Sequence, residues 1–565
     1  MSARNNIALF VLGLTVATPI YANTKKSLQW EVKHASWTKG HEKAYEEFIA
    51  TLGKAKKAGV CNTTNECIKS SVANPKYYNL NPANLSTVYS DCADLPYILR
   101  AYFSWVNDLP FSFPVALTQN YPDTPENRLI EEELKEVYKE YYNSGFIKKK
   151  MLEGKIKDLK KKLYGSTKNN DIRYNRYGNK INDKRYIKNG DNINKVLVDV
   201  VGAISTASFR TDGANNETGK NFRDTYPVAI SREAIKPGTV LYDPNGHIAV
   251  VYEVTSNGKI HLIDAHPDNS LTAITYGEKF SQTQSYVGGG FSNWRPFTYE
   301  NGNVSAKSNE ELSDYSLEQF NPGKLYELGG EQMKFHEYVR NKLTPGSLVY
   351  NPVNELKEVL EEVCYDVKER DVAVNISLKS GLQNQSHPDL LPANIYGTDG
   401  DWENYSSPSR DARLKASVRE ARELMIKLID GYDKGLKNIS YEGHDLKGDL
   451  LKTYNQVTKQ CKLTITKTNG QEVLLNLDQI LDSIYALSFD PYHCVELRWG
   501  LTSSEDLASC NQSANKIEWY KAEQGLRNRI ERDYSMKMDF SLKELPSAPI
   551  SKVKQENISI KEVLN

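Results

Sequence analysis

The alternation of apolar and polar positions changes character along the chain. Leu95, Leu99, Tyr102 and Val106 recur at helical spacing, whereas β-branched and aromatic residues dominate 240–266. Helical spacing returns in 356–367 and again in 414–428. Amphipathic helices show the first spacing, and buried strands are rich in the second type of residue. The pattern therefore predicts an α+β arrangement followed by a mainly helical C-terminal half.

An apolar run near the N-terminus predicts export. Arg4 precedes the run Ile7 to Val16, and the small-residue sequence Ile20-Tyr21-Ala22 follows it. This order is typical of a cleaved signal peptide, which we assign to residues 1–22. No later stretch reaches the ~18 unbroken apolar residues of a spanning helix. We expect a secreted or periplasmic protein with no stable membrane insertion after signal cleavage.

Composition shifts suggest how the exported chain is divided. A charged, lysine-rich stretch over 125–194 reads as a helical insertion within one domain, and a polar stretch over 301–316 reads as a linker. The expected parts are a catalytic domain (23–300, with the insertion at 125–194), the linker (301–316), a mainly helical C-terminal domain (317–540) and an irregular tail (541–565).

Charge and ligand patterns narrow the classes of partner. The 72 Lys and Arg residues balance the 72 Asp and Glu residues, so no global charge favours nucleic acid. The sequence also lacks the short ligand pairs of common structural zinc sites. We therefore predict no nucleic-acid partner, no metal and no cofactor.

Seven cysteines in an exported chain leave one without a partner. Cys61 and Cys67 lie close enough for a small ring, and Cys494 and Cys510 bracket a loop. Cys364 and Cys461 are then left for a long-range bridge in the C-terminal half. Cys92 is unpaired by subtraction, which makes it a candidate nucleophile. The alternative is that Cys92 is a structural cysteine or forms a bridge with another cysteine.

Cys92 lies where a helix is expected to begin. A thiol at a helix N-terminus has its thiolate stabilised by unpaired amides and the helix dipole, and Ser90 or Asp94 could cap this start. Pro96 fits only the first turn of a helix. The helix therefore begins near Asp94, with Cys92 just before it, or it kinks.

A β-hairpin supplies candidate partners for the thiol. Two β-rich runs flank Asn257-Gly258, which is typical of a tight turn. With a two-residue turn there, His247 lies opposite Asp268, and a shift of the turn by one residue places His247 opposite His266. Because side chains alternate along strands, either register puts Asp264 on the His247 face as well.

These two blocks resemble a known family. Asp91-Cys92-Ala93-Asp94-Leu95 looks like the Asp-Cys-Ser-Gly-Leu segment of NlpC-type cell-wall peptidases. The segments 246–251 and 258–266 are similar to the histidine hairpin of that family and of the CHAP amidases. The resemblance implies a papain-like α+β domain and cysteine-dependent cleavage of amide bonds in peptidoglycan; it does not extend to the C-terminal half.

The resemblance also suggests a role for each residue. Cys92 would be the nucleophile and His247 the base that takes its proton. The NlpC pattern favours His266 as the residue that orients the base, whereas the CHAP pattern favours Asp264; we favour His266. The expected substrate is a cell-wall peptide or another amide.

Two other functions fit the same residues. An acyltransferase, including a transglutaminase-like enzyme, would use the same triad with an amine acceptor. A non-catalytic scaffold would keep the papain-like core without activity and bind a protein partner through its C-terminal half.

Overall fold

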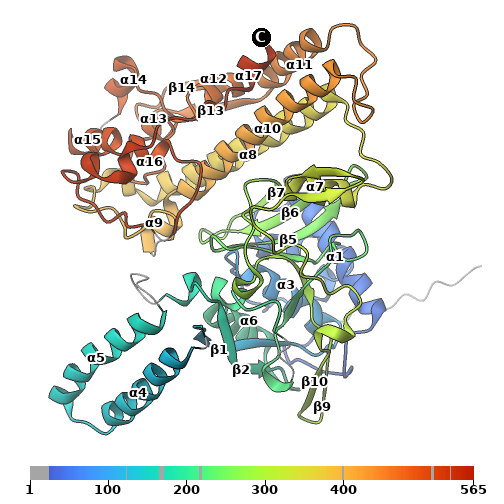
Figure 1. Ribbon diagram of the computed structural model, residues 1–565, viewed down its shortest axis with the longest axis vertical. Coiled ribbons are helices and arrows are strands. Elements are labelled where there is room, and N and C mark those ends of the chain that lie inside the picture. Colours follow the sequence, from blue (N-terminus) through green and yellow to red (C-terminus); the bar gives the residue numbers. More distant parts are fainter. Residues whose placement is uncertain are drawn as a thin grey trace, which may run out of the picture.

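The computed structural model describes residues 25–122, 124–164, 171–215, 219–397, 400–510, 514–534 and 536–565. Helices make up 44% and strands 15%, so the chain is the α+β protein that the pattern predicts. The signal peptide expected at 1–22 lies outside the described residues. Figure 1 shows a sheet-containing part, a helical part above it, and a helical hairpin that projects from the first.

A six-stranded antiparallel sheet forms the centre of the first part. Its strand order is β3-β8-β4-β5-β6-β7, so the hairpin β5–β6 is internal. Its strands are β3 (Thr225–Pro227), β4 (Val240–Asp243), β5 (His247–Val254), β6 (Ile260–Ala265), β7 (Leu271–Thr275) and β8 (Gly290–Trp294).

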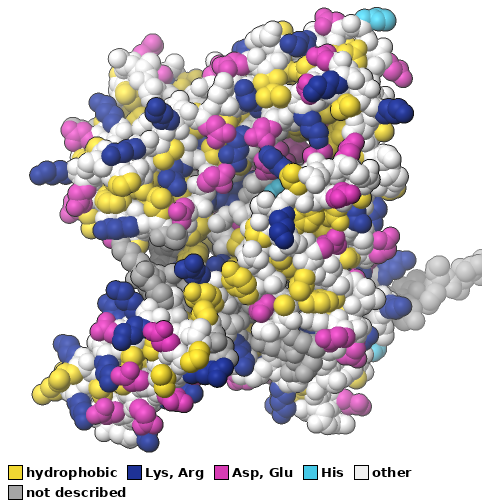
Figure 2. Space-filling view, viewed as in Figure 1, with side chains coloured by type: hydrophobic (Ala, Val, Ile, Leu, Met, Phe, Trp, Pro, Cys, Tyr) yellow, Lys and Arg dark blue, Asp and Glu magenta, His cyan; other side chains and the backbone are white. Residues whose placement is uncertain are grey.

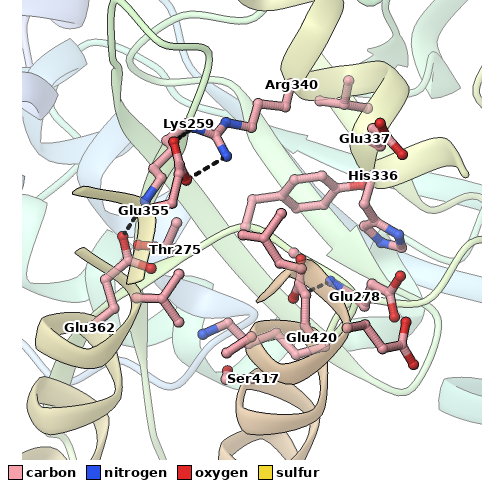
Figure 3. A pocket seen from close by; sticks show the side chains of 18 of the residues that line it. Lys259, Thr275, Glu278, His336, Glu337, Arg340, Glu355, Glu362, Ser417 and Glu420 are labelled. Atoms are coloured by element: carbon pink, nitrogen blue, oxygen red, sulfur yellow. Dashed lines mark hydrogen bonds and ion pairs between the residues drawn. The ribbon is translucent and has the colours of Figure 1, made fainter. Parts of the chain in front are cut away.

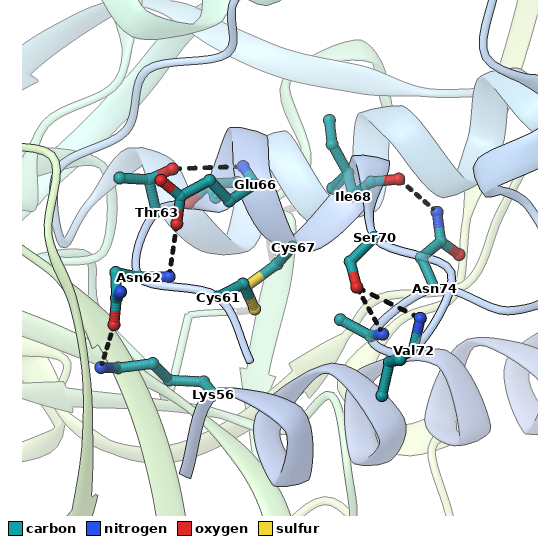
Figure 4. Close-up of a disulfide and its surroundings, with 12 residues drawn as sticks. Lys56, Cys61, Asn62, Thr63, Glu66, Cys67, Ile68, Ser70, Val72 and Asn74 are labelled. Atoms are coloured by element: carbon teal, nitrogen blue, oxygen red, sulfur yellow. Dashed lines mark hydrogen bonds between the residues drawn. A yellow bond between two sulfur atoms is a disulfide. The ribbon is translucent and has the colours of Figure 1, made fainter. Parts of the chain in front are cut away.

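Helices cover one face of this sheet. Ile248, Val250 and Ile263 point to this face and share a core with α1 (Lys39–Lys57), α3 (Asp94–Val106) and α6 (Ile193–Ala203). The short α2 (Thr64–Lys69) contains Cys67, which forms a disulfide with Cys61 (Figure 4). The loop that this disulfide closes is fixed to the sheet, because the Leu271 N–H donates to the Asn62 carbonyl at 2.8 Å.

The other face is covered by residues that follow the sheet in sequence. Val251 and Leu262 pack here against α7 (Phe335–Leu343), which β11 (Tyr326–Leu328) and β12 (Glu331–Met333) precede. The segment expected to be a linker, 301–316, also packs on the sheet domain: it holds part of the hairpin of β9 (Phe297–Glu300) and β10 (Asn303–Ala306). Apolar side chains beyond 317 therefore complete this domain.

The lysine-rich stretch forms an insertion within the sheet domain. Its helices α4 (Pro125–Tyr142) and α5 (Phe146–Tyr164) pack on each other through a small apolar core. The strands β1 (Ser112–Gln119) and β2 (Asn179–Tyr186) pair at its base. A separate core and a two-stranded base explain why the hairpin projects in Figure 1, and Figure 2 shows charged side chains of both signs on its surface.

Long helices form the C-terminal half. α8 (Pro352–Ser380), α10 (Pro408–Asp433) and α11 (Leu446–Gln460) share one core, and the hairpin of β13 (Lys462–Thr466) and β14 (Glu472–Asn476) turns at Asn469-Gly470. The shorter helices are α9 (Gly400–Tyr405), α12 (Leu477–Asp482), α13 (Val495–Arg498), α14 (Ser504–Ser509), α15 (Ala514–Ala522), α16 (Gln524–Arg527) and α17 (Ile560–Leu564).

Two predictions about this half have different outcomes. The disulfides Cys364–Cys461 and Cys494–Cys510 form as the spacing predicts, and Cys92 is the free cysteine. The tail expected to be irregular contains α17, whose Ile560 and Leu564 are buried in the helical core. No helix among the described residues is long and apolar enough to cross a membrane.

Candidate functional site around Cys92

Cys92 lies immediately before α3, which begins at Asp94. The Asp91 side chain caps the helix: its Oδ1 accepts hydrogen bonds from the N–H groups of Ala93 (2.8 Å) and Asp94 (3.0 Å). Of the two predicted caps, Ser90 instead bonds the Thr64 hydroxyl at 2.7 Å, and Asp94 is the first residue of the helix. Pro96 lies within the first turn, where the backbone N–H that proline lacks would have no partner in the helix. The helix therefore starts without a kink there.

The Cys92 sulfur lies against the backbone on both sides of His247. Sγ is 3.9 Å from the Gly246 carbonyl oxygen, to which the thiol donates, and the Ile248 N–H donates to the sulfur. Residues far apart in sequence therefore meet where β5 begins.

The β5–β6 hairpin differs from the expected two-residue turn. Thr255 and Lys259 close a loop of three residues, and the pairing shifts by one residue at Tyr252. Beyond this bulge Val250 pairs with Ile263. When this register is continued to the start of β5, His247 lies level with His266. The one-residue bulge offsets the extra residue in the loop. Near His247 the strand register is therefore the one expected when the turn is shifted by one residue.

A buried hydrogen-bonded network surrounds His247. Its Nε2 contacts Asp264 Oδ2, and the Thr272 hydroxyl donates to the other carboxylate oxygen. His266 Nε2 lies 3.1 Å from the Thr272 hydroxyl and 3.7 Å from Asp264, and its ring stacks on His247 with centroids 5.8 Å apart. Asp264, rather than His266, is thus the group hydrogen-bonded to the His247 ring.

The network favours a neutral imidazole beside an ionised carboxylate. Burial lowers the pKa of His247, and the Arg413 guanidinium lowers it further, while Asp264 opposes both. Burial alone would raise the pKa of Asp264, but the His266 and His247 rings and Arg413 hold it well below its usual range. Near neutral pH His247 can therefore accept a proton.

The thiol itself is held in its protonated form. Burial raises the pKa of Cys92 well above its usual value, and Asp91 raises it further. Asp94 is protonated at neutral pH, because burial and Asp91 raise its pKa to about 9. The expectation of a thiolate stabilised by a helix N-terminus is therefore wrong for this arrangement, since desolvation and a carboxylate outweigh the helix amides.

Three arginines from the C-terminal half lie over this network. Arg532 Nη2 is 2.8 Å from Asp243 Oδ2, and Arg410 Nη2 is 3.4 Å from Asp268 Oδ2. Arg413 is 8% exposed and forms no hydrogen bond or ion pair with any described residue, although its charge acts on His247 and Asp264. Arg410 and Arg413 occupy the first turns of α10, where the helix dipole disfavours cations. Cations at this end of a predicted helix were therefore the sequence feature that could have indicated carboxylates nearby.

Two tyrosines lie beside the turn that precedes His247. Tyr174 stacks on Tyr534, with ring centroids 5.2 Å apart. A Cβ on Gly246 would come within 3.3 Å of the Tyr174 ring. Gly246 also has a φ of 81°, in the left-handed region that favours glycine. The glycine before His247 is thus needed both for the turn and for this close contact.

A second histidine cluster lies within the C-terminal half. His387, Asp490 and Glu523 are buried close enough together to hold a metal ion. His387 already has a partner at each ring nitrogen: Nδ1 lies 2.7 Å from the Pro388 carbonyl and Nε2 lies 2.9 Å from Asp490. Hydrogen bonds to Pro388 and Asp490 thus occupy both ring nitrogens of His387.

Comparisons of the chain with models of protein families, with curated proteins and with solved structures gave no match.

Proposed function

We propose that the protein is a cysteine-dependent hydrolase of amide bonds with a papain-like catalytic domain. The observation that supports this most directly is the buried His247–Asp264 pair, which lies next to the backbone that contacts the Cys92 sulfur. A nucleophilic thiol requires a base and a group that orients the base. Asp264, and not His266 as we favoured from the sequence, takes the orienting role in this proposal.

The chemistry begins from a neutral thiol and a neutral imidazole. His247 Nε2 is engaged by Asp264, which leaves Nδ1 to take the Cys92 proton as sulfur attacks the substrate carbonyl carbon. The imidazolium then protonates the leaving amine, the C–N bond breaks, and an acyl-enzyme remains. Water, deprotonated by His247, attacks the thioester and releases the carboxylic acid and the thiol.

Amide bonds of cell-wall peptides are the proposed substrates, and the periplasm or the exterior is the proposed location. Three disulfides support the location, because such bonds persist in oxidising compartments.

The test is digestion of purified peptidoglycan by the protein without residues 1–22, with products separated by liquid chromatography. Cys92→Ala and His247→Gln should each abolish the release of new amino termini. His261→Gln is the matched control, because His261 lies in the same hairpin but bonds Thr275 at 3.1 Å. Full activity of the Cys92→Ala variant would refute the proposal.

A further inference from the structure

A cavity of about 300 Å³ lies between the two halves of the molecule, apart from the Cys92 site. The sheet side contributes residues of β6, β7 and α7, and the helical side contributes residues of α8 and α10. Its size is at the lower end of the range for small-molecule sites. Figure 3 shows the polar side chains that enter it from both halves.

Apolar side chains form much of the wall. Ile260, Val359, Val363 and Leu424 line the cavity, together with the ring of Tyr276. A wall of this kind accommodates a hydrocarbon chain, while a few polar groups fix its orientation.

The cations that line the cavity are already neutralised. In the interior, the pairs are Lys259–Glu362 (3.4 Å), Lys279–Asp366 (3.3 Å) and Arg340–Glu355 (2.7 Å). Lys334 and Lys427, whose side chains are 59% and 49% exposed, are also held by glutamates at the rim. Among the described lining residues, no lysine or arginine is therefore left to bind an anion.

Glu420 is the lining carboxyl that forms no ion pair with a described residue. Its Oε2 accepts a hydrogen bond from the Glu278 N–H at 2.9 Å. A Cβ on Gly277 would come within 2.5 Å of this oxygen, so the glycine lets the carboxyl approach the backbone. One turn earlier on α10, the buried hydroxyl oxygen of Ser417 has no hydrogen-bond partner among the described residues (Figure 3).

We propose that this cavity binds a small organic ammonium ion, with the ammonium group on Glu420 and Ser417 and its hydrocarbon chain against the apolar wall. The seven acidic and five basic lining residues leave a formal charge of −2 when all are ionised, which a cation complements. The proposal is independent of the chemistry proposed at Cys92.

Protonation of Glu420 should compete with the ligand. Burial raises the pKa of Glu420 to about 7; the Glu278 N–H and Lys279 lower it, whereas the Glu278 and Glu362 carboxylates raise it. His336 on α7 stays neutral, because burial lowers its pKa, and its Nε2 lies 2.8 Å from the Phe280 carbonyl. Since an ammonium ion favours the carboxylate, affinity should rise as the pH increases through 7, and binding at pH 6.5 should release a proton.

Isothermal titration calorimetry of the whole exported chain tests the proposal with 1,5-diaminopentane as the probe and 1,5-pentanediol as its uncharged counterpart. We expect saturable binding of the diamine at pH 7.5 and none of the diol. Glu420→Gln, which keeps the oxygen that accepts from Glu278, should weaken binding about tenfold or more. At pH 6.5 the heat should depend on the ionisation enthalpy of the buffer.

Glu423→Gln is the matched control, because it removes the same charge from the same helix at a position 46% exposed to solvent. This change should weaken binding about threefold at most. Absence of diamine binding, equal binding of the diol, or equal losses in the two variants would overturn the proposal. Thermal unfolding curves of both variants verify that the measured proteins are folded.

Discussion

At the scale of single residues, the two carboxyls beside Cys92 act differently on the thiol although they are three positions apart. Asp91 is hydrogen-bonded to two backbone N–H groups and raises the pKa of Cys92. Asp94 has a pKa of about 9, so it is uncharged near neutral pH and does little to oppose formation of the thiolate. The chain itself therefore offers a pair of matched substitutions.

We predict that alkylation of Cys92 at pH 8 is slower than that of a cysteine in an unstructured peptide. The reason is that burial and Asp91 raise the thiol pKa, which lowers the thiolate fraction. Asp91→Asn should accelerate the reaction, because asparagine still caps a helix but carries no charge. Iodoacetamide labelling followed by mass spectrometry measures the rate.

Asp94→Asn serves as the control for this measurement, since a protonated carboxyl and an amide are both uncharged. Its alkylation rate should stay close to that of the unchanged protein. Equal acceleration by both substitutions would show that Asp94 is ionised, contrary to its raised pKa.

The sequence was sufficient to identify these residues but not their state. Cys92 as the free thiol, and Asp264 and His266 as neighbours of His247, follow from counting and from strand alternation. The raised pKa of Cys92 depends on desolvation, which requires the packed structure. Thr272 was not predicted as part of the network, because its hydroxyl reaches Asp264 only when β7 pairs with β6 in the sheet.

At the scale of elements, the disulfides close loops of very different length. Cys364–Cys461 joins α8 to the end of α11 across 97 positions, whereas Cys61–Cys67 spans 6. A cross-link removes more entropy from the unfolded chain when its loop is longer.

We predict that Cys364→Ala with Cys461→Ala lowers the stability of the helical half by about 4–5 kcal/mol, against about 2–3 kcal/mol for loss of the short ring. Urea unfolding followed by circular dichroism, with Cys61→Ala and Cys67→Ala as the comparison, measures both losses. A larger loss from the short ring would show that local contacts, and not loop entropy, determine the order.

Elements with local signals were predictable, and those defined by distant contacts were not. The hairpins at Asn257-Gly258 and Asn469-Gly470 and the start of α3 near Asp94 follow from short sequence motifs. The polar sequence of 301–316 gives no sign of its contacts with the sheet domain, such as the pairing of Tyr315 with Val228, because these residues lie far apart in the chain. The three-residue loop and the bulge were not predicted, because each shifts the strand pairing by one residue and the two shifts offset each other near His247.

At the scale of the whole molecule, ion pairs join the sheet domain to the helical half. Asp243, whose side chain is fully buried, faces Arg532, and Lys56 faces Glu369 at 3.1 Å. The residue before Arg532, Glu531, instead pairs with Arg419 while its own side chain is 75% exposed. Adjacent positions thus provide a buried pair and an exposed pair.

We predict that Arg532→Gln destabilises the protein by about 3–5 kcal/mol, because it leaves the buried Asp243 carboxylate without its cation. Arg419→Gln, which breaks the exposed pairs with Glu531 and Glu556, should cost about 1 kcal/mol or less. Chemical unfolding followed by tryptophan fluorescence compares the two variants. Similar small losses in both would show that Asp243 does not depend on Arg532.

The contacts that Arg532 and Tyr534 make beside the Cys92 site have a consequence for the order in which the chain is made. Cys92, His247 and Asp264 precede the helical half in the sequence, whereas Arg532 and Tyr534 lie far beyond them. A nascent chain therefore has the thiol and its base before it has these two residues. Docking of the segment that carries Arg532 and Tyr534, and not assembly of the sheet, is the step that adds their contacts to the site.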